Sequence, residues 1–175
     1  MKNVNVLIGR FQPFHNGHLQ VCRDAMKENG FPTVVMYIHN EKFDQKKPFS
    51  DGLLEKEFEI LKQTEDCFED AIWLRRPWPT LICRILQEHG YNPILWLAGE
   101  DRIDGYRKLM DEQKIRDELN MEPPAFYITQ RYGSATDVRN ALKSGNKDFY
   151  IEHMPVGTEV LFEEFTEQLK SIING

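Results

Sequence analysis

Two histidines three positions apart, His15 and His18, stand where an apolar run of the sequence gives way to a helical pattern. Residues 4–9 have the composition of a buried strand, and apolar residues recur with helical spacing after His18. A helix start carries unpaired N–H groups and the positive end of the helix dipole, so such a junction binds phosphates. Histidine adds a donor or a positive charge near neutral pH. The junction therefore predicts a nucleotide phosphate site, with Gly17 allowing close backbone approach.

Basic residues in two nearby segments fit the same chemistry. Arg10 follows the glycine that ends the first strand, and a guanidinium can clamp phosphate oxygens in a bidentate manner that lysine cannot copy. Lys46 and its neighbour Lys47 lie in a polar loop after the second strand-like run, on the edge that also presents the histidines. Both lysines are candidates for phosphate contact, although loop lysines are commonly solvated charges.

A second helix start lies near the carboxyl end of the chain. Ser134 and Thr136 precede Arg139 at a spacing that places all three in the first turns of one helix. The hydroxyls can cap the helix and hold phosphate oxygens together with the backbone N–H groups, and Arg139 adds charge. Arg131 precedes this segment and is a further candidate for phosphate contact.

Two more segments contribute candidates for the remaining parts of a nucleotide and its reaction partner. Gly99 and Asp101 follow an apolar run, where the carboxylate could accept from a ribose hydroxyl or hold Mg²⁺ through water. Trp78, flanked by prolines and preceded by Arg76, could stack on an acceptor molecule. The alternatives are a plain turn for the first segment and a buried core position for the tryptophan.

Five strand-like runs alternate with helical patterns, which predicts an α/β protein with a parallel sheet and right-handed crossovers. The predicted strands are residues 4–9, 34–38, 72–74, 93–97 and 125–129. The predicted helices are residues 18–29, 51–63, 79–89, 103–119, 134–144 and a terminal helix over residues 156–175. We expect one domain over residues 1–175, with that terminal helix packed on it.

Composition excludes several classes of protein. A formal net charge of -6 argues against a general nucleic-acid binder. No apolar run approaches the roughly 20 residues of a membrane helix, and no signal segment precedes the first strand, so we expect a cytoplasmic protein. Three cysteines without a CxxC pair predict packed, reduced thiols, and we assign no metal ligands to the chain. The oligomeric state stays open, homo-oligomers included.

The run GRFQPFHNGHL, residues 9–19, resembles the first motif of the HxGH nucleotidyltransferases. The run RYGSATDVR, residues 131–139, resembles the closing SxTxxR signature of that family, and Pro48-Phe49-Ser50 is similar to its PFT segment. Within the family the chain looks most like the nicotinamide-mononucleotide adenylyltransferases of archaeal and phage type. The resemblance covers residues 4 to about 155.

The resemblance implies a Rossmann-like open parallel sheet with helices on both faces and an adenylyl transfer from ATP. It implies His18, His15, Lys46 and Arg139 as catalytic residues, with His18 the more important histidine. The implied nucleotide contacts are Gly9, Arg10, Phe11, Gln12, Gly17, Gly99, Asp101, Arg131, Ser134 and Thr136. The implied partners are ATP carrying Mg²⁺ and a phosphate-bearing acceptor, nicotinamide mononucleotide, with Trp78 and Arg76 at the acceptor.

Two departures from the family pattern keep other acceptors open. Gly52-Leu53-Leu54 replaces the usual GER triplet and so lacks its arginine, and residues 75–79 do not reproduce the segment that recognises the nicotinamide ribotide. The alternatives are a cytidylyltransferase for a small alcohol phosphate, an adenylyltransferase for phosphopantetheine or flavin mononucleotide, and a nucleotide-binding module without turnover.

Overall fold

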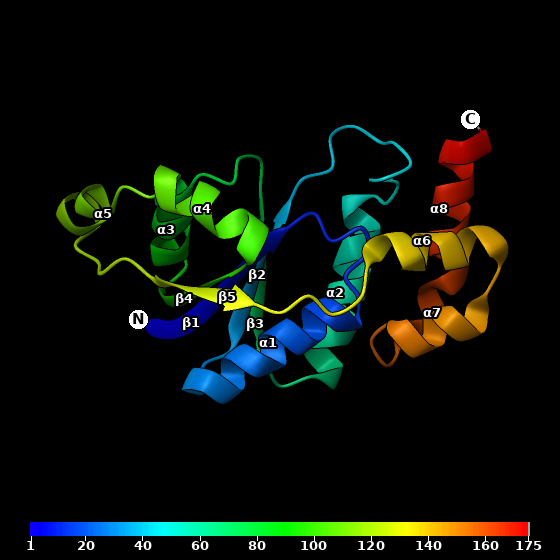
Figure 1. Cartoon of the computed structure of the whole chain (residues 1–175), viewed down its shortest axis with the longest axis horizontal. Helices are drawn as coiled ribbons and strands as arrows, with labels where there is room; N and C mark the ends of the chain where they lie inside the picture. The colour runs from blue at the N-terminus through cyan, green and yellow to red at the C-terminus, as the bar shows by residue number, and fades with distance from the viewer. Residues whose placement is uncertain (175) are drawn as a thin grey trace. The chain divides into compact units, whose positions relative to one another are not determined.

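Five strands form one open parallel sheet in the order β3-β2-β1-β4-β5 (Figure 1). They are β1 (Lys2–Gly9), β2 (Thr33–Ile38), β3 (Phe68–Leu74), β4 (Tyr91–Gly99) and β5 (Ala125–Thr129). Residues 34–37 of β2 are fully buried, as a parallel strand covered on both faces should be. The predicted α/β class and parallel sheet are confirmed.

The computed structural model describes residues 1–174, which separate into two compact units. The sheet unit comprises Met1–Ile8, Val21–Ile38 and Cys67–Arg131. The helical unit comprises Gly9–Gln20, His39–Asp66 and the residues from Tyr132 onward. Each unit therefore gathers three stretches that are distant in the sequence, and each is described by itself below.

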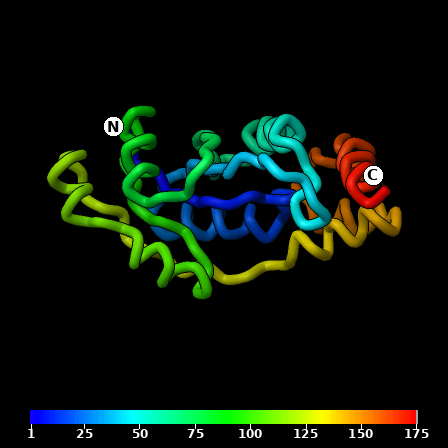
Figure 2. The backbone as a smooth tube through the Cα atoms, turned by 90° about the horizontal axis from the view of Figure 1, so that it is seen from above, coloured from blue at the N-terminus to red at the C-terminus, as the bar shows by residue number. Residues whose placement is uncertain are grey.

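One face of the sheet is covered by α3 (Pro79–Glu88), α4 (Glu100–Leu109) and α5 (Glu112–Leu119), which lie above the strands in Figure 1. Trp96 of β4 is fully buried at the centre of this layer, with the rings of Tyr106 and Phe126 against it at 5.2 and 6.2 Å. Figure 2 shows α3 beside α5, where Gln87 donates to the Leu119 carbonyl at 2.6 Å.

The opposite face of the sheet receives α1 (Asn16–Asn29), of which the part from Val21 belongs to the sheet unit. Asn5 is a polar residue buried in the central strand, and its amide pairs reciprocally with the amide of Asn29 at 2.7 and 3.0 Å. This pair ties the end of α1 to β1, so a polar group inside the sheet is satisfied rather than costly. Helices therefore cover both faces, as predicted.

The helical unit contains α2 (Asp51–Thr64), α6 (Ala135–Ser144), α7 (Lys147–His153), the 3-10 turn η1 (Thr158–Leu161) and α8 (Phe162–Asn174). In Figure 1, α6, α7 and α8 follow one another in gold, orange and red. Their core is aromatic: Phe49 meets Phe165 edge to face at 4.7 Å, and Tyr150 meets Phe162 at 5.1 Å. The chain from residue 39 to residue 66 is thereby packed on the carboxyl-terminal helices.

Two predicted helices are wrong in their bounds. Residues 103–119 do not form one helix, because α4 ends at Leu109 and the side chain of Asp111 caps α5 by accepting from the N–H of Lys114 at 3.0 Å. The terminal helix begins at Phe162 rather than near residue 156, because Gly157 has φ +96° and interrupts it. Val160, which lies in the 3-10 turn before α8, is 75% exposed.

The bounds of the other predicted helices and strands agree with the structure within a few residues. Ser50 caps α2 and Gly145 ends α6 in the left-handed conformation. The helix α7 escaped sequence analysis because its seven residues are too few to display a helical period. All three cysteines are buried and free, as predicted. No helix among the described residues combines the length and apolar character needed to cross a bilayer.

Candidate functional site

The predicted site residues divide between the two units. The histidine loop, the lysine loop and the start of α6 all belong to the helical unit. Candidate residues as far apart in the sequence as Gly9 and Arg139 therefore lie in the same compact unit. These residues are Gly9, Arg10, Phe11, Gln12, His15, Gly17, His18, Lys46, Ser134, Thr136 and Arg139. Gly99, Asp101, Arg131, Arg76 and Trp78 belong to the sheet unit.

The two histidine rings lie against each other, with centroids 3.9 Å apart and an interplanar angle of 33°. His15 is buried, whereas His18 retains some exposure. Phe11 meets the His18 ring edge to face at 4.9 Å, and Phe14 lies 5.0 Å from it. Aromatic neighbours on several sides fix the plane of the His18 ring, so its nitrogen atoms point in defined directions.

Backbone hydrogen bonds set the tautomer of both histidines. Nδ1 of His15 accepts from the N–H of Gly17 at 2.9 Å, and Nδ1 of His18 accepts from the N–H of His15 at 3.1 Å. An imidazole that accepts at Nδ1 carries its proton on Nε2 when neutral. Burial, and to a smaller extent the neighbouring His15, lower the pKa of His18 well below 6.5. At neutral pH His18 is therefore a neutral Nε2–H donor rather than a cation.

Gly17 is required by close packing within the helical unit. A Cβ at this position would lie 1.6 Å from the carbonyl oxygen of Tyr132 and 2.6 Å from Cε1 of His15. The segment before α6 therefore packs directly against the histidine loop, with the Tyr132 carbonyl against Gly17. The group that approaches Gly17 in the structure is this carbonyl of the protein itself, and the predicted approach of a phosphate to the Gly17 backbone stays a prediction.

Phe11 has an unusual backbone conformation, with φ +52° in a residue that is not glycine. Its ring folds back onto Gly9, where an added Cβ would lie 3.0 Å from Cζ of Phe11. Phe11 is buried, so its contribution is to shape the loop beneath the histidines. Arg10, between Gly9 and Phe11, is exposed and available for a phosphate.

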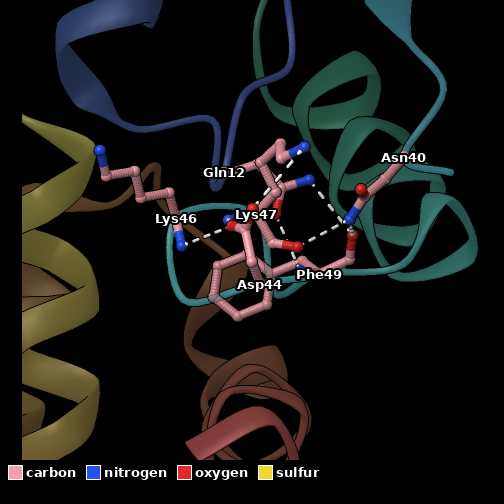
Figure 3. A network of polar contacts seen from close by, with 6 residues as sticks. All are labelled: Gln12, Asn40, Asp44, Lys46, Lys47 and Phe49. Carbon is pink, nitrogen blue, oxygen red and sulfur yellow. Dashed lines mark hydrogen bonds and ion pairs between the residues drawn. The ribbon is translucent and has the colours of Figure 1, made fainter. Parts of the chain in front are cut away.

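Gln12 is held by two hydrogen bonds to the backbone of Phe49, as Figure 3 shows. Its Nε2 donates to the Phe49 carbonyl at 3.2 Å, and its Oε1 accepts from the Phe49 N–H at 2.8 Å. Asn40 donates through Nδ2 to the same carbonyl at 2.8 Å and to the Lys47 carbonyl at 2.9 Å. These bonds join the histidine loop to the lysine loop over 37 positions of sequence.

The lysine loop makes a tight turn around Asp44. One carboxylate oxygen of Asp44 accepts from the N–H groups of Lys46 and Lys47, both at 2.9 Å. The ammonium of Lys47 lies 3.8 Å from the other oxygen. The Lys46 side chain extends away from this network (Figure 3) and is exposed. Of the two lysines, Lys46 is therefore the one whose charge is presented outward.

Arg139 reaches from α6 back to the histidine loop. Its Nη1 donates to the backbone carbonyl of Gln12 at 2.7 Å and its Nη2 to Oγ1 of Thr136 at 3.2 Å. Burial lowers the pKa of the Arg139 guanidinium, while the charge of Asp44 opposes the shift. A guanidinium stays charged at neutral pH, so this is a partly buried positive charge next to the histidine loop.

Ser134 caps α6: its hydroxyl oxygen accepts from the N–H groups of Thr136 and Asp137 at 3.1 and 3.4 Å. The capping role that sequence analysis weighed against phosphate binding is therefore present. A hydroxyl that accepts in a cap still has its own proton to donate, so capping and phosphate contact are compatible.

Sequence analysis missed Glu57, a fully buried carboxyl group on α2. Its Oε1 accepts from the N–H of Phe14 at 3.2 Å, and no described residue hydrogen-bonds to Oε2. Burial raises the pKa of Glu57 well above 4.5, and the Phe14 N–H opposes the shift only in part. The signal was its spacing, because position 57 shares a helical face with the apolar Leu54, Phe58 and Leu61.

In the sheet unit, Gly99 ends β4 and caps α4, and Asp101 lies in the first turn of that helix, exposed. Asp101 and the adjacent Glu100 put negative charge at this helix start, which disfavours an anion there. The segment therefore suits hydroxyl recognition better than phosphate binding. Arg131, two residues after β5, is exposed.

Trp78 is 59% exposed at the start of α3, and Arg76 is exposed before it. The buried-core alternative for Trp78 is thus wrong. Core roles belong instead to Trp96 and Phe14, both fully buried. Among residues 1–174 no three His, Cys, Asp or Glu side chains gather as a metal-binding group would.

The helical unit thus joins two neutral imidazole donors, a partly buried guanidinium, an exposed ammonium and a capped helix start. Each of these groups can stabilise negative charge on phosphate oxygens, and none of them is a nucleophile activated by a neighbouring base. The arrangement fits phosphate binding and in-line transfer rather than covalent catalysis.

Comparison with known proteins identifies similar chains. The model of the cytidylyltransferase-like family matches residues 6–150. A nicotinamide-nucleotide adenylyltransferase of Picrophilus torridus is 40% identical over 48 residues, which are 26% of this chain and 27% of that protein.

Two solved structures share the fold. A bifunctional NMN adenylyltransferase/ADP ribose pyrophosphatase from Francisella tularensis superposes with a TM-score of 0.72 at 19% identity, covering 99% of this chain and 53% of that chain. Another structure of this bifunctional enzyme holds AMP and a manganese ion. A nicotinic acid mononucleotide adenylyltransferase of Plasmodium falciparum superposes with a TM-score of 0.63 at 14% identity, covering 96% and 98%. This chain thus spans about half the length of the Francisella protein.

Proposed function

This chain belongs to the cytidylyltransferase-like family of nucleotidyltransferases, and we propose that it transfers AMP from ATP to nicotinamide mononucleotide. The products are NAD and pyrophosphate. The paired histidines carry the proposal, because backbone hydrogen bonds turn both into Nε2–H donors within the unit that holds Arg139 and Lys46. The short match to the archaeal adenylyltransferase supports the choice of acceptor.

The reaction needs positioning and positive charge more than covalent chemistry. A phosphate oxygen of the acceptor attacks the α-phosphorus of ATP, and the bond to the bridging oxygen breaks as pyrophosphate leaves. Negative charge grows on the α-phosphate oxygens and on the leaving group. In this proposal His18 and His15 donate to those oxygens, while Arg139 and Lys46 neutralise the pyrophosphate and Ser134 and Thr136 hold its terminal oxygens.

A divalent ion would enter bound to the phosphates of ATP, since the described residues contain no preassembled metal cluster. Such an ion neutralises charge between the phosphates. Sequence analysis placed Asp101 near the nucleotide. Its exposed position at the start of α4 supports a role in accepting a hydrogen bond from a ribose hydroxyl.

The test is to incubate the purified protein with MgATP and phosphate acceptors, following pyrophosphate release and the mass of the product. Nicotinamide mononucleotide is the first acceptor, and nicotinic acid mononucleotide, flavin mononucleotide and phosphopantetheine complete the panel. We expect NAD as the main product. Turnover with another acceptor only would overturn the proposed acceptor but keep the transfer.

Because Gly52-Leu53-Leu54 lacks the arginine of the related triplet, CTP with a small alcohol phosphate forms a second arm of the assay. Release of pyrophosphate from CTP alone would identify a cytidylyltransferase. No release from either nucleotide, with ATP still bound in equilibrium dialysis, would indicate a nucleotide-binding module.

A further inference from the structure

Gln12 lies in the histidine loop, yet its side chain is committed to the protein rather than to a ligand. It is 5% exposed, and both ends of its amide bond to the backbone of Phe49, at 2.8 and 3.2 Å. The Gln12 amide thus donates to the carbonyl and accepts from the N–H of one residue, as the backbone of a neighbouring β-strand does in a sheet. A buried amide whose donor and acceptor are both satisfied has a structural role, because Gln12 would have to give up these two hydrogen bonds before its side chain could bind a nucleotide.

Asn40 completes the arrangement from the other side. Its Nδ2 donates to the carbonyls of Phe49 and Lys47 at 2.8 and 2.9 Å, while its buried Oδ1 has no hydrogen-bond partner among the described residues. An amide whose oxygen is left unpaired is held in place by its two donors. Asn40 and Gln12 therefore meet at one carbonyl, and we call Gln12, Asn40 and the Phe49 backbone the amide clamp.

The amide clamp joins the segments that carry the candidate phosphate ligands. Gln12 is three residues from His15, and its own carbonyl accepts from Arg139 at 2.7 Å. Lys47, whose carbonyl Asn40 holds, is next to Lys46 in the turn around Asp44. The histidine loop, Arg139 and the lysine turn are thus joined through hydrogen bonds to Gln12 and Asn40, and Figure 3 shows the part of this network between Gln12, Asn40 and the lysine turn.

We propose that the amide clamp is the positioning element that sets Lys46 relative to the histidine loop, with Gln12 and Asn40 as positioning residues that do not contact substrate. The inference rests on the proposed function for the identity of the ligand, ATP. Catalysis of phosphoryl and nucleotidyl transfer depends on simultaneous contact with several phosphate oxygens. A shift of the lysine turn would remove that contact while leaving each side chain intact.

The test uses Gln12→Leu, which removes both bonds at similar volume, and Asn40→Asp, which keeps the shape but loses the two donors. The control is Gln63→Leu, at an exposed position on α2. With ATP and the acceptor that supports turnover, we expect kcat/KM to fall about 10²-fold for each clamp variant and to stay unchanged for the control.

A double-mutant cycle with Lys46→Ala separates positioning from a general loss of stability. If the clamp acts by placing Lys46, Lys46→Ala costs about tenfold in the parent and less than about threefold in the Gln12→Leu or Asn40→Asp background. Equal costs in both backgrounds would overturn the proposal. Should Gln12→Leu fail to fold, the Asn40→Asp cycle decides alone.

Hydrogen exchange gives a reading that does not depend on catalysis. In the full-length protein we expect the amides of Lys46, Lys47 and Phe49 to be protected, and to exchange faster in both clamp variants than in Gln63→Leu. Unchanged exchange would refute the clamp even if the enzyme is active. Loss of protection in a protein that neither binds ATP nor releases pyrophosphate would uphold the clamp and reject the proposed function.

Discussion

His18 is the residue on which the proposed chemistry depends most. Its Nδ1 accepts from the backbone, its ring lies against Phe11, Phe14 and His15, and burial lowers its pKa well below 6.5. A neutral donor in a fixed plane needs no reorganisation when charge appears on a phosphate oxygen. The histidine loop is therefore better described as a pair of aimed hydrogen-bond donors than as a cluster of positive charges.

His18→Ala should lower kcat by about 10²- to 10³-fold, because one donor to the transition state is lost. The melting temperature should change little, since the ring is not fully enclosed. Steady-state kinetics and thermal denaturation measure the two effects. The exposed His89→Ala is the control, and turnover of His18→Ala close to the parent value would remove His18 from the catalytic role.

Gly17→Ala tests the close approach of the Tyr132 carbonyl. The added methyl group would lie 1.6 Å from that oxygen, so the backbone must shift, and we expect a loss of about 1–3 kcal/mol in the free energy of unfolding. Gly52→Ala is the matched control, since nothing lies within 4 Å of its Cβ position and alanine favours a helix by about 0.5–1 kcal/mol. Denaturant titration of both variants should give opposite signs, and equal signs would contradict the packing described here.

At the scale of elements, α2 contacts the histidine loop through the buried carboxyl group of Glu57. The helix presents an apolar face that contains this one acid, and the acid accepts from the N–H of Phe14. The segment before α2 is held by the amide clamp, and Gln168 of α8 accepts from the N–H of Ser50 at 2.9 Å. The loop that carries the histidines is thus ordered by helices that contribute none of the predicted ligands.

Glu57→Gln should stabilise the protein increasingly as pH rises. A carboxyl whose folded pKa is raised gives full stability below its unfolded value, near 4.5, and loses it as pH climbs toward the folded pKa. Glutamine keeps the acceptor for Phe14 and does not titrate. Urea denaturation from pH 5 to pH 8 should show a difference that widens with pH, whereas the exposed Glu59→Gln should not. A constant difference would mean that Glu57 is ionised in the folded state throughout this range.

At the scale of the whole molecule, the candidate residues come from two compact units, each assembled from three stretches of chain. The helical unit holds the candidates for phosphate contact and transfer. The sheet unit holds Gly99 and Asp101 at the start of α4, and Arg76 with the exposed Trp78 before α3. In the proposed function the sheet unit thus contributes candidates for both substrates, Gly99 and Asp101 for the nucleotide and Arg76 and Trp78 for the acceptor.

Trp78→Ala should raise the KM of the acceptor about tenfold or more while changing the KM of ATP little, because a stacked aromatic contributes roughly 1–3 kcal/mol of binding to a base. The side chain is mostly exposed, so stability should be preserved. Leu81→Ala, on the same helix and also exposed, serves as control. An effect confined to the KM of ATP would refute the acceptor assignment.

Local patterns in the sequence were sufficient for the elements and for the type of chemistry. Apolar runs predicted five strands, helical hydrophobic periods predicted the helices between them, and hydroxyl residues predicted the capped start of α6, where Ser134 is the cap. The histidine spacing predicted a nucleotide phosphate site, and the resemblance of residues 9–19 to the HxGH motif implied a nucleotidyltransferase, a family that the match over residues 6–150 confirms. These features are local because hydrogen bonding within helices, and the burial of their apolar faces, depend on neighbours a few positions away.

Only the tertiary structure decided the hydrogen bonds, the exposure and the pKa shifts of the candidate residues. The hydrogen bonds between Gln12 and Phe49 join residues 37 positions apart, and the bond that the Phe14 N–H donates to Glu57 spans 43 positions. The exposure of Trp78 and the depressed pKa of His18 likewise depend on what the folded chain does or does not bring near them. A sequence pattern records residue types at a spacing, whereas burial and long-range hydrogen bonds exist only once distant segments have packed together.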